Sequence, residues 1–416
     1  MSSVAVADSV IIIGAGIFGL STALAISRRW PSAKVTIIDR LTPPVEDGTS
    51  VDTTRCIRAD YADSVYARLA AEAQRRIEDD VDLSRHYFKQ GMSFICDGKP
   101  GRFFDIWAKG LENARKSQDP SSLVEMHSAN EVFSRLHGPD AKLVSEQELG
   151  RSRNWIQGYC NLEDAFIDAP VDRVVHGDGV ASGVLLDNGE KLNADLIIVA
   201  AGAWSARLLD LQDSMFSSAI EVAWVKVTAE EERRWKNMSI TTNLSTGFNI
   251  FPPHNGEIKM LRRSAGYRNT VTVPHPEDSN KMITISYPRT TITNPTDVIP
   301  QEAEDALRDN LKELFPTLAS RPFDRTKLCW LAQTPTADFI VCPHPRIQGL
   351  HVATGGSAHA WKLLPIIGDL VLDSIEGILD EELKQKWRWG RNGGDSGNAP
   401  RMEGSVKELK EIVGDT

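Results

Sequence analysis

A glycine-rich turn near the start of the chain constrains the fold more than any other feature. The apolar run 10–13 precedes Gly14-x-Gly16-x-x-Gly19, helical spacing follows, and a second apolar run ends at Asp39. This order predicts a β-α-β unit of an α/β domain. The glycines allow a tight turn, close approach of the backbone to a diphosphate and close helix packing, and Asp39 would bind a ribose diol. The unit therefore predicts dinucleotide binding, and the acidic Asp39 disfavours a 2'-phosphate, which leaves NAD or FAD.

The composition excludes several classes of protein. The 416 residues are 41% hydrophobic and 25% charged, the balance of a globular chain with a sizeable core. The 47 basic and 57 acidic residues give a net charge of −10 without an evident basic patch, so we expect no nucleic-acid partner. No run approaches the roughly 18–20 apolar residues of a membrane helix, so we expect no membrane partner. Five scattered cysteines without a C-x-x-C pair argue against a metal site and favour a reducing compartment.

Periodicity predicts helices in several places after the first unit. Helical spacing recurs over 65–77, 106–116 and 303–315, and the last of these places four apolar residues on one face. Ser145 and Glu148 have the spacing of a capping box, which predicts a short helix start.

Other segments have the pattern of strands. Short β-rich runs with a turn at 187–189 predict a meander between 171 and 194, which leads into a buried strand at 196–199. Alternating segments predict a mixed sheet outside the first domain. These segments are 221–228, 258–261 and 282–287.

A spacing in the last quarter of the chain is typical of one protein family. Cys329 precedes Lys362 by 33 residues, and Lys362 ends the sequence Gly-Ser-Ala-His-Ala-Trp-Lys. Here the chain resembles the amine-oxidising branch of the D-amino-acid-oxidase-like flavoproteins, which includes monomeric sarcosine, pipecolate, saccharopine and fructosyl amine oxidases. In that family a cysteine 33 residues before the lysine of this motif is bonded to the 8α carbon of FAD. The resemblance implies FAD as the cofactor, held covalently by Cys329.

Further motifs extend the resemblance over nearly the whole chain. Residues 54–58, TRCIR, are similar to the family's T-R-I-I-R, whose first arginine contacts the flavin region and whose second binds the substrate carboxylate. Residues 256–259, GEIK, are similar to the segment with the oxygen-activating lysine. Residues 201–204, AGAW, are similar to the turn beneath the cofactor.

Physical chemistry is consistent with these implied roles. Arg58 and Lys362 would fix a carboxylate, the first by a planar fork and the second as a point charge. Lys259 would stabilise the negative charge that develops on oxygen. The catalytic candidates are therefore Lys259 and Arg55, and the substrate-binding candidates are Arg58 and Lys362. The expected cofactor-binding residues are Gly14, Gly16, Ile17, Phe18, Gly19, Asp39, Arg40, Thr54, Arg55, Gly202, Trp204, Cys329, Gly356, Ser357, Ala358, His359 and Lys362.

The chain departs from the family pattern in two places. Two glycines of the lysine motif are Ala358 and Ala360, and its phenylalanine is Trp361, so we expect a narrower pocket. The meander begins at once at Val171, and roughly 25 residues that in the family form a helix and a strand beside the adenine half of FAD are absent after Ala169, which we expect to expose a sheet edge.

The fold class we predict is α/β, with a Rossmann-like FAD-binding domain of the glutathione-reductase type and a mixed-sheet α+β substrate domain. The FAD-binding domain is expected to be discontinuous, over 1–75, 145–212 and 326–390, with the substrate domain over 76–144 and 213–325. A flexible tail with a short helix is expected at 391–416.

The expected reaction is the oxidation of the C–N bond of a secondary amine or amino acid, which releases an imine and hydrogen peroxide. We expect a monomer that uses a small-molecule amine and oxygen, in the cytoplasm because the chain does not end in a peroxisomal signal. Two alternatives remain: an NAD-dependent dehydrogenase, which leaves the Cys329–Lys362 spacing without a purpose, and a diverged member of the family without catalytic activity.

Overall fold

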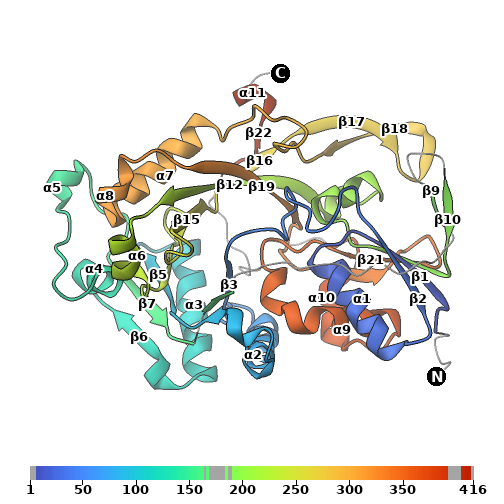
Figure 1. Ribbon diagram of the computed structural model, residues 1–416, viewed down its shortest axis with the longest axis horizontal. Coiled ribbons are helices and arrows are strands. Elements are labelled where there is room, and N and C mark those ends of the chain that lie inside the picture. Colours follow the sequence, from blue (N-terminus) through green and yellow to red (C-terminus); the bar gives the residue numbers. More distant parts are fainter. Residues whose placement is uncertain (1–5, 164, 168–182, 186–189, 392–403, 414–416) are drawn as a thin grey trace.

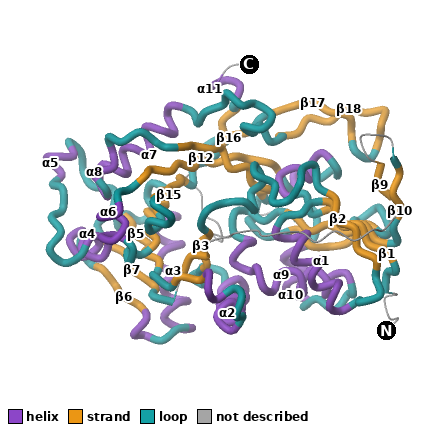
Figure 2. Tube along the Cα trace, viewed as in Figure 1, coloured by secondary structure: helices purple, strands orange, loops and turns teal. Residues whose placement is uncertain are grey.

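The computed structural model describes residues 6–163, 165–167, 183–185, 190–391 and 404–413. Two sheets organise these residues. The smaller sheet, with α1, α9 and α10 against it, occupies the right half of Figure 1, and the larger sheet extends from the centre to the left. Figure 2 shows that the left half carries its helices mainly at the periphery of the strands.

The smaller sheet has five strands in the order β2-β1-β11-β21-β20. The strands β2 (Lys34–Ile38), β1 (Ser9–Ile13), β11 (Leu196–Val199) and β21 (Leu350–Thr354) run parallel, and β20 (Ile340–Pro343) runs antiparallel to β21. Strands from both ends of the chain thus form one sheet, whose parallel core needs helices on its faces.

Helices α1 (Ile17–Arg29) and α9 (Leu364–Ile375) cover this sheet and cross each other closely. A Cβ atom at Gly368 of α9 would lie 2.0 Å from the carbonyl oxygen of Ser21 of α1, so the crossing requires glycine. Helix α2 (Ser64–Asp79) begins where Asp63 accepts hydrogen bonds from two backbone N–H groups, and its buried residues join the same core.

The larger sheet is built around a long antiparallel pair. Strand β12 (Phe216–Lys226) pairs with β19 (Arg325–Gln333) and, through its outer half, with β15 (Glu257–Arg262). The sheet continues from β15 through β14, β13, β5 and β7 to β6. Helix α7 (Gln301–Leu314) packs on it through its apolar face, which consists of Ala303, Leu307, Leu311 and Leu314.

The remaining elements complete the two halves. The remaining helices are α3 (Arg102–Ser117), α4 (Ala129–His137), α5 (Glu146–Leu149), α6 (Ala229–Trp235), α8 (Pro316–Ala319), α10 (Glu381–Trp387), α11 (Lys410–Val413) and the 3-10 turns η1 (Ser84–His86), η2 (Pro120–Ser122), η3 (Gly202–Arg207), η4 (Gln212–Ser214) and η5 (Ala360–Leu363). The remaining strands are β3 (Arg55–Ile57), β4 (Tyr87–Phe88), β5 (Met92–Cys96), β6 (Leu123–Met126), β7 (Gln157–Asn161), β8 (Ala165–Ile167), β9 (Gly183–Leu185), β10 (Lys191–Asn193), β13 (Ile240–Asn243), β14 (Phe248–Ile250), β16 (Tyr267–Arg268), β17 (Thr270–His275), β18 (Asp278–Ser286) and β22 (Lys407–Glu408).

The predicted elements are present where the structure describes them, but the expected mixed sheet is wrong for 282–287, because β18 pairs with β17 in a separate two-stranded sheet whereas β12 and β15 lie in the larger one. The β-α-β unit is β1-α1-β2, the three periodic segments are α2, α3 and α7, and Ser145 and Glu148 form the predicted capping box at α5. Of the meander, β9 and β10 form an antiparallel pair, whereas 171–182 and the turn 187–189 lie outside the described residues.

The domain limits remain a prediction, but two strands differ from the expected grouping. Strands β7 and β19 lie within ranges expected for the FAD-binding domain, and both are hydrogen-bonded into the larger sheet. Their partners, β5 and β12, are remote in sequence, and local patterns do not encode such pairing. Within the described part of the chain, β2 is an edge strand of the smaller sheet, because it pairs with β1 alone.

No helix of the described residues is long and apolar enough to cross a membrane.

Candidate functional site

The glycine turn between β1 and α1 leaves no room for side chains. Gly14 has a φ of +111°, and a Cβ atom there would lie 2.4 Å from the carbonyl oxygen of Ala200. A Cβ atom at Gly19 would lie 1.8 Å from the carbonyl oxygen of Gly14, and one at Gly16 would lie 3.0 Å from Ser50 Oγ. Helix α1 has no acidic residue in its first turn, so its positive end can accept an anion.

Asp39, directly after β2, faces this turn. Its carboxylate accepts a hydrogen bond from the Ala15 backbone N–H at 2.7 Å and another from the Arg40 N–H at 2.7 Å. The Arg40 guanidinium stacks on the Trp204 ring, 4.2 Å from its centroid, and pairs with Asp47. Gly202, at the start of η3, has a φ of +52°. The structure thus brings Asp39, Arg40 and the 201–204 turn to the end of the sheet where the glycine turn lies.

Two more predicted residues of α1 link this end to the lysine motif. The Ile17 N–H donates to Ser50 Oγ at 3.0 Å. Phe18 packs edge to face on Phe339, and a Cβ atom at Gly356 would lie 3.3 Å from the Phe18 ring. The motif near the C-terminus therefore lies against the first helix.

Residues 49–54 form a loop that lies on the larger sheet. The Trp224 indole N–H donates to Thr53 Oγ1 at 3.1 Å, and Lys327 Nζ donates to the Val51 carbonyl oxygen at 3.1 Å. The Thr49 hydroxyl donates to the Trp330 carbonyl oxygen. This loop runs from the end of the smaller sheet that carries the glycine turn to strand β3. Its contacts with the larger sheet fix the loop and thereby position Arg55, which directly follows it.

Lys259 is a buried lysine of β15 that points at this loop. Its Nζ lies 3.0 Å from Asp52 Oδ2, donates to the Thr54 carbonyl oxygen, and lies 4.1 Å from the centroid of the Phe251 ring. Burial of the ammonium group lowers the pKa of Lys259 to about 8, although the Asp52 charge opposes that shift. Asp52, also buried, has its pKa lowered by Lys259 and Arg55 despite its own burial. The sequence analysis did not identify Asp52 as a functional residue.

Cys329 lies on the same face of the larger sheet as Lys259. Residues that pair directly across a ladder point to the same face of the sheet. Lys259 pairs with Trp224 of β12, and Cys329 pairs with Ile220 of the same strand. Trp224 and Ile220 lie on one face of β12, so Lys259 and Cys329 share that face. The thiol of Cys329 is close enough to act electrostatically on Lys259. Cys329 is 7% exposed and packs among apolar side chains of β12 and β19, in a cluster of Ile220, Val222, Trp224 and Leu331.

Three buried polar atoms near this face have no hydrogen-bond partner among the described residues: Thr54 Oγ1, Arg55 Nε and Trp361 Nε1. Arg55 and Trp361 are in contact, since the Arg55 guanidinium carbon lies 5.4 Å from the Trp361 ring centroid. Buried donors without a partner cost free energy unless a ligand satisfies them. Together with the glycine turn that a Cβ atom would fill, these donors fit FAD, whose diphosphate would be bound at the N-terminus of α1.

Arg58 and His359 both contact Tyr61, and Lys362 lies near His359. The Arg58 guanidinium carbon lies 4.4 Å from the centroid of the Tyr61 ring, and Arg58, Lys362 and His359 are each less than 5% exposed. Burial, then the charges of Lys362 and Arg58, hold the pKa of His359 well below its ordinary value. His359 Nε2 lies 2.7 Å from the Ala337 carbonyl oxygen, so Nε2 carries the proton and Nδ1 accepts from the Tyr61 hydroxyl at 3.1 Å. His359 is thus a neutral residue that orients Tyr61.

Arg263 adds a further positive charge that the sequence analysis did not identify. It follows β15, and its N–H donates to the Gly247 carbonyl oxygen at 2.8 Å. Burial and then the Arg58 charge lower the pKa of Arg263 to about 10, so the two guanidinium groups are close. The spacing of four residues from Lys259, two strand periods, was the available signal, because it places both side chains on one face.

The lysine motif has a strained backbone. Ser357 and Ala358 have φ values of +45° and +65°, in the left-handed region that residues with a Cβ rarely adopt. Ser357 is fixed there by its N–H, which donates to the Ala332 carbonyl oxygen at 2.9 Å. Strain of this kind gathers at functional sites.

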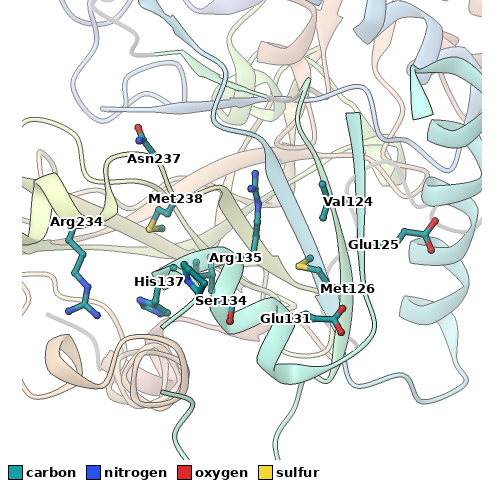
Figure 3. Close-up of a pocket in the computed structure, with 13 residues that line it drawn as sticks. Val124, Glu125, Met126, Glu131, Ser134, Arg135, His137, Arg234, Asn237 and Met238 are labelled. Atoms are coloured by element: carbon teal, nitrogen blue, oxygen red, sulfur yellow. The ribbon is translucent and has the colours of Figure 1, made fainter. Parts of the chain in front are cut away.

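A cavity of about 570 Å³ lies elsewhere, at the far end of the larger sheet. Figure 3 shows that its lining comes from β6, α4, α6 and the segment after α6. None of the predicted site residues lines it. The hydrogen bonds of His137 with Leu314 and Trp235 fix its ring beside this cavity, and burial lowers the pKa of His137 to about 4. We assign no role in the reaction to this cavity.

Comparisons with known proteins agree with this arrangement. The family described as FAD dependent oxidoreductase matches residues 9–374. The L-saccharopine oxidase of Schizosaccharomyces pombe is 28% identical over an alignment of 407 positions, gaps included, which covers 92% of this chain and 93% of that protein. An amino acid oxidase of Aspergillus flavus is 29% identical over an alignment of 481 positions, gaps included, which covers 93% of this chain and 98% of that protein. A modified fructosyl peptide oxidase from Aspergillus nidulans superposes with a TM-score of 0.83 at 24% identity, over 97% of this chain and 98% of that one. The fold class and the resemblance predicted from the sequence are confirmed.

Proposed function

The chain belongs to the FAD-dependent oxidoreductase family, and on that basis we propose which residues carry out its reaction, the oxidation of the C–N bond of a secondary amine or amino acid. The family decides between the two dinucleotides in favour of FAD. The L-saccharopine oxidase and the amino acid oxidase among its relatives support a substrate that is an amino acid bearing a substituent on its nitrogen. We further propose that the enzyme acts as a monomer and passes its electrons to oxygen.

FAD supplies the chemistry that side chains lack, because it accepts a hydride from the carbon next to the amine nitrogen. The protein's part is to bind, orient and exclude water. We propose that the N-terminus of α1 holds the diphosphate, that Asp39 holds the ribose, and that Thr54, Arg55 and Trp361 donate to the flavin ring from its pocket. The support is the close-packed glycine turn and the three unsatisfied atoms.

Arg58 and Lys362 are proposed to orient the substrate by its carboxylate. Both are nearly fully buried and lie near His359, whose pKa is lowered first by burial and then by their charges. A buried cation pair binds a carboxylate more strongly than exposed cations do, because water screens the charges less. Fixing the carboxylate holds the reacting C–H bond in one position, and position alone accounts for a large part of such rate enhancements.

Lys259 is proposed to serve the reaction with oxygen. Its ammonium group, held by Asp52 and the Thr54 carbonyl, places a positive charge on the sheet face that also carries Cys329. A fixed charge stabilises the negative charge that oxygen acquires on reduction, at no cost of reorganisation. Asp52 keeps the ammonium charged in its buried position.

Cys329 is proposed to form a thioether with the 8α carbon of FAD: the C–S bond replaces the thiol S–H bond and one 8α C–H bond, and the two electrons and two protons released pass to oxygen, which becomes hydrogen peroxide. The observation that carries the whole proposal is geometric: Cys329 and Lys259, on different strands, share the sheet face beside the loop that leads to Arg55 and Arg58. One ring bound between the sheets can then reach all four side chains.

An amine panel with a visible spectrum tests the proposed function. Purified protein should show flavin absorbance, bleach without oxygen when an N-substituted amino acid is added, and release one peroxide per amine oxidised in air. The NAD-dependent alternative predicts instead a colourless protein whose activity requires added NAD. A coloured protein that no amine bleaches would favour the alternative of a family member without catalytic activity.

A further inference from the structure

Arg263 is a charged side chain that the function proposed above does not use. It directly follows β15, and strand alternation places it on the same face as Lys259 and Leu261. Its side chain is partly buried, and among the residues that the structure describes its guanidinium group has no hydrogen bond or ion pair. A guanidinium group has five N–H donors, so this one is available for a ligand.

The surroundings of Arg263 are those of the proposed substrate site. The positive charge of Arg263 lies close to that of Arg58 and helps to lower the pKa of His359. Cys56 and Tyr61 are the other titratable groups that act on Arg263. Tyr61 in turn contacts Arg58 and donates to His359. Arg58 after β3 and Arg263 after β15 therefore lie near one aromatic ring, and Lys362 in η5 lies near His359, which that ring contacts.

No carboxylate of the described residues pairs with Arg263. The acid nearest to Arg58 in sequence, Asp60, accepts a hydrogen bond from Asn161 Nδ2 at 2.8 Å, and the Glu221 carboxylate pairs with the neighbouring Arg262. A third cation beside two others is unfavourable in a partly desolvated site unless an anion binds there. Two cations are enough to hold one carboxylate, so the third implies a second anionic group.

We propose that Arg263 binds a second acidic group of the substrate, which makes the preferred substrate an N-substituted amino acid with two carboxylates. This inference rests on the function proposed above, in which Arg58 and Lys362 hold the first carboxylate. A substrate with one carboxylate leaves Arg263 without a partner in the complex, and an unmade charge-assisted hydrogen bond gives strong discrimination.

Binding of two unreactive acids tests this inference without turnover. Glutarate has two carboxylates, and butyrate has one on a chain of similar length. Each is titrated into the oxidised holoenzyme, and the change in the visible flavin spectrum gives its dissociation constant. We expect glutarate to bind at least about tenfold more tightly than butyrate, a difference that one charge-assisted contact readily supplies.

Arg263→Met should remove the advantage of glutarate and leave the binding of butyrate nearly unchanged. Arg263→Lys, which keeps the charge and loses the fork, should retain part of that advantage and serves as the matched control for folding. Turnover of N-methylglutamate and of N-(3-carboxypropyl)alanine then tells whether the second carboxylate belongs to the amino-acid side chain or to the nitrogen substituent.

The outcomes separate the two proposals. Equal affinities of the wild-type enzyme for glutarate and butyrate, or equal losses of both in Arg263→Met, would overturn the dicarboxylate inference while leaving the proposed function intact. If neither acid changes the flavin spectrum and Arg58→Ala alters the turnover of no amine, both proposals are wrong.

Discussion

The nucleotide end and the reacting end of the site are built in opposite ways. The nucleotide end comes from one contiguous stretch, β1-α1-β2 with Asp39, and acts mainly through backbone groups and glycines. The reacting end joins the loop after Thr49, β15, β19 and η5, and acts through buried cations. A chain of net charge −10 thus concentrates positive charge in one place. The contrast predicts that single charge changes alter the reaction far more than they alter cofactor binding.

The largest effect is expected from Lys259→Met. Loss of the buried ammonium charge should slow the reaction of the reduced enzyme with oxygen by about 10²–10³-fold or more. Reduction of the flavin by substrate should change little, because the nucleotide end is untouched. Stopped-flow reoxidation measures the first rate and anaerobic reduction the second.

Lys327→Met is the matched control for that change. Lys327 lies on the same strand as Cys329, and its Nζ donates to the Val51 carbonyl oxygen rather than to Asp52. Its loss should leave reoxidation close to the wild-type rate. Equal slowing in both variants would show that the charge of Lys259 has no special place in the reaction with oxygen.

A pH dependence should follow from the same lysine. Because the pKa of Lys259 is lowered to about 8, its charge is complete below that pH, and the rate of reoxidation should fall as the pH rises through 8. Asp52→Asn removes the anion that favours the charged form, so the fall should begin at lower pH. Asp47 is a buried acid that pairs with Arg40 at the nucleotide end. Asp47→Asn is therefore the control and should leave the pH profile of reoxidation unchanged. If the pH profile of reoxidation is the same in Asp52→Asn as in the wild type, Asp52 does not keep Lys259 in its charged form.

Substitution of Arg58 or Lys362 should weaken substrate binding by an intermediate amount. Loss of one partner of a buried carboxylate costs about 2–5 kcal/mol, or at least about 30-fold in affinity. Amines that lack a carboxylate should be nearly indifferent to Arg58→Ala and Lys362→Ala. Steady-state kinetics with both substrate classes decides, and an equal loss for both classes would contradict the carboxylate role.

The smallest effect is expected at the strained turn. Ala358 has a φ of +65°. Ala358→Gly should relieve backbone strain in the folded protein but give the unfolded chain more conformational freedom. The net effect expected is a stabilisation of about 0.5 kcal/mol. Ala360→Gly, in the adjacent η5 turn, should instead destabilise it by about 0.5–1 kcal/mol. Denaturant unfolding measures both. If both variants are destabilised alike, the backbone at Ala358 carries no strain.

The same contrast explains what could be predicted from the sequence. Helices α2, α3 and α7 and the capping box at α5 follow local rules of periodicity and capping, and the structure confirms them. Strand β5 was missed because all five of its residues are buried and it has no alternation. The placement of β7 and β19 in the larger sheet depends on remote partners.

Among the site residues, the sequence analysis missed those whose role depends on distant neighbours. Asp52 becomes relevant through Lys259, 207 residues later in the chain. Arg263 becomes relevant through Arg58, which follows β3 and is remote in sequence. Neither lies in a motif of its own, whereas the glycine turn and the Cys329–Lys362 spacing are visible as patterns in one stretch of sequence.

The central claim is that one FAD spans both ends, with its nucleotide at the glycine turn and its flavin bonded to Cys329. Mass spectrometry of a tryptic digest of the denatured protein tests it most directly. The account predicts a peptide containing Cys329 that is heavier by the mass of FAD less the two hydrogen atoms lost when the thioether forms. It also predicts that the Cys329→Ala variant releases its flavin on denaturation. Free FAD from the denatured wild-type protein, or the added mass on a peptide containing Cys342, would contradict it.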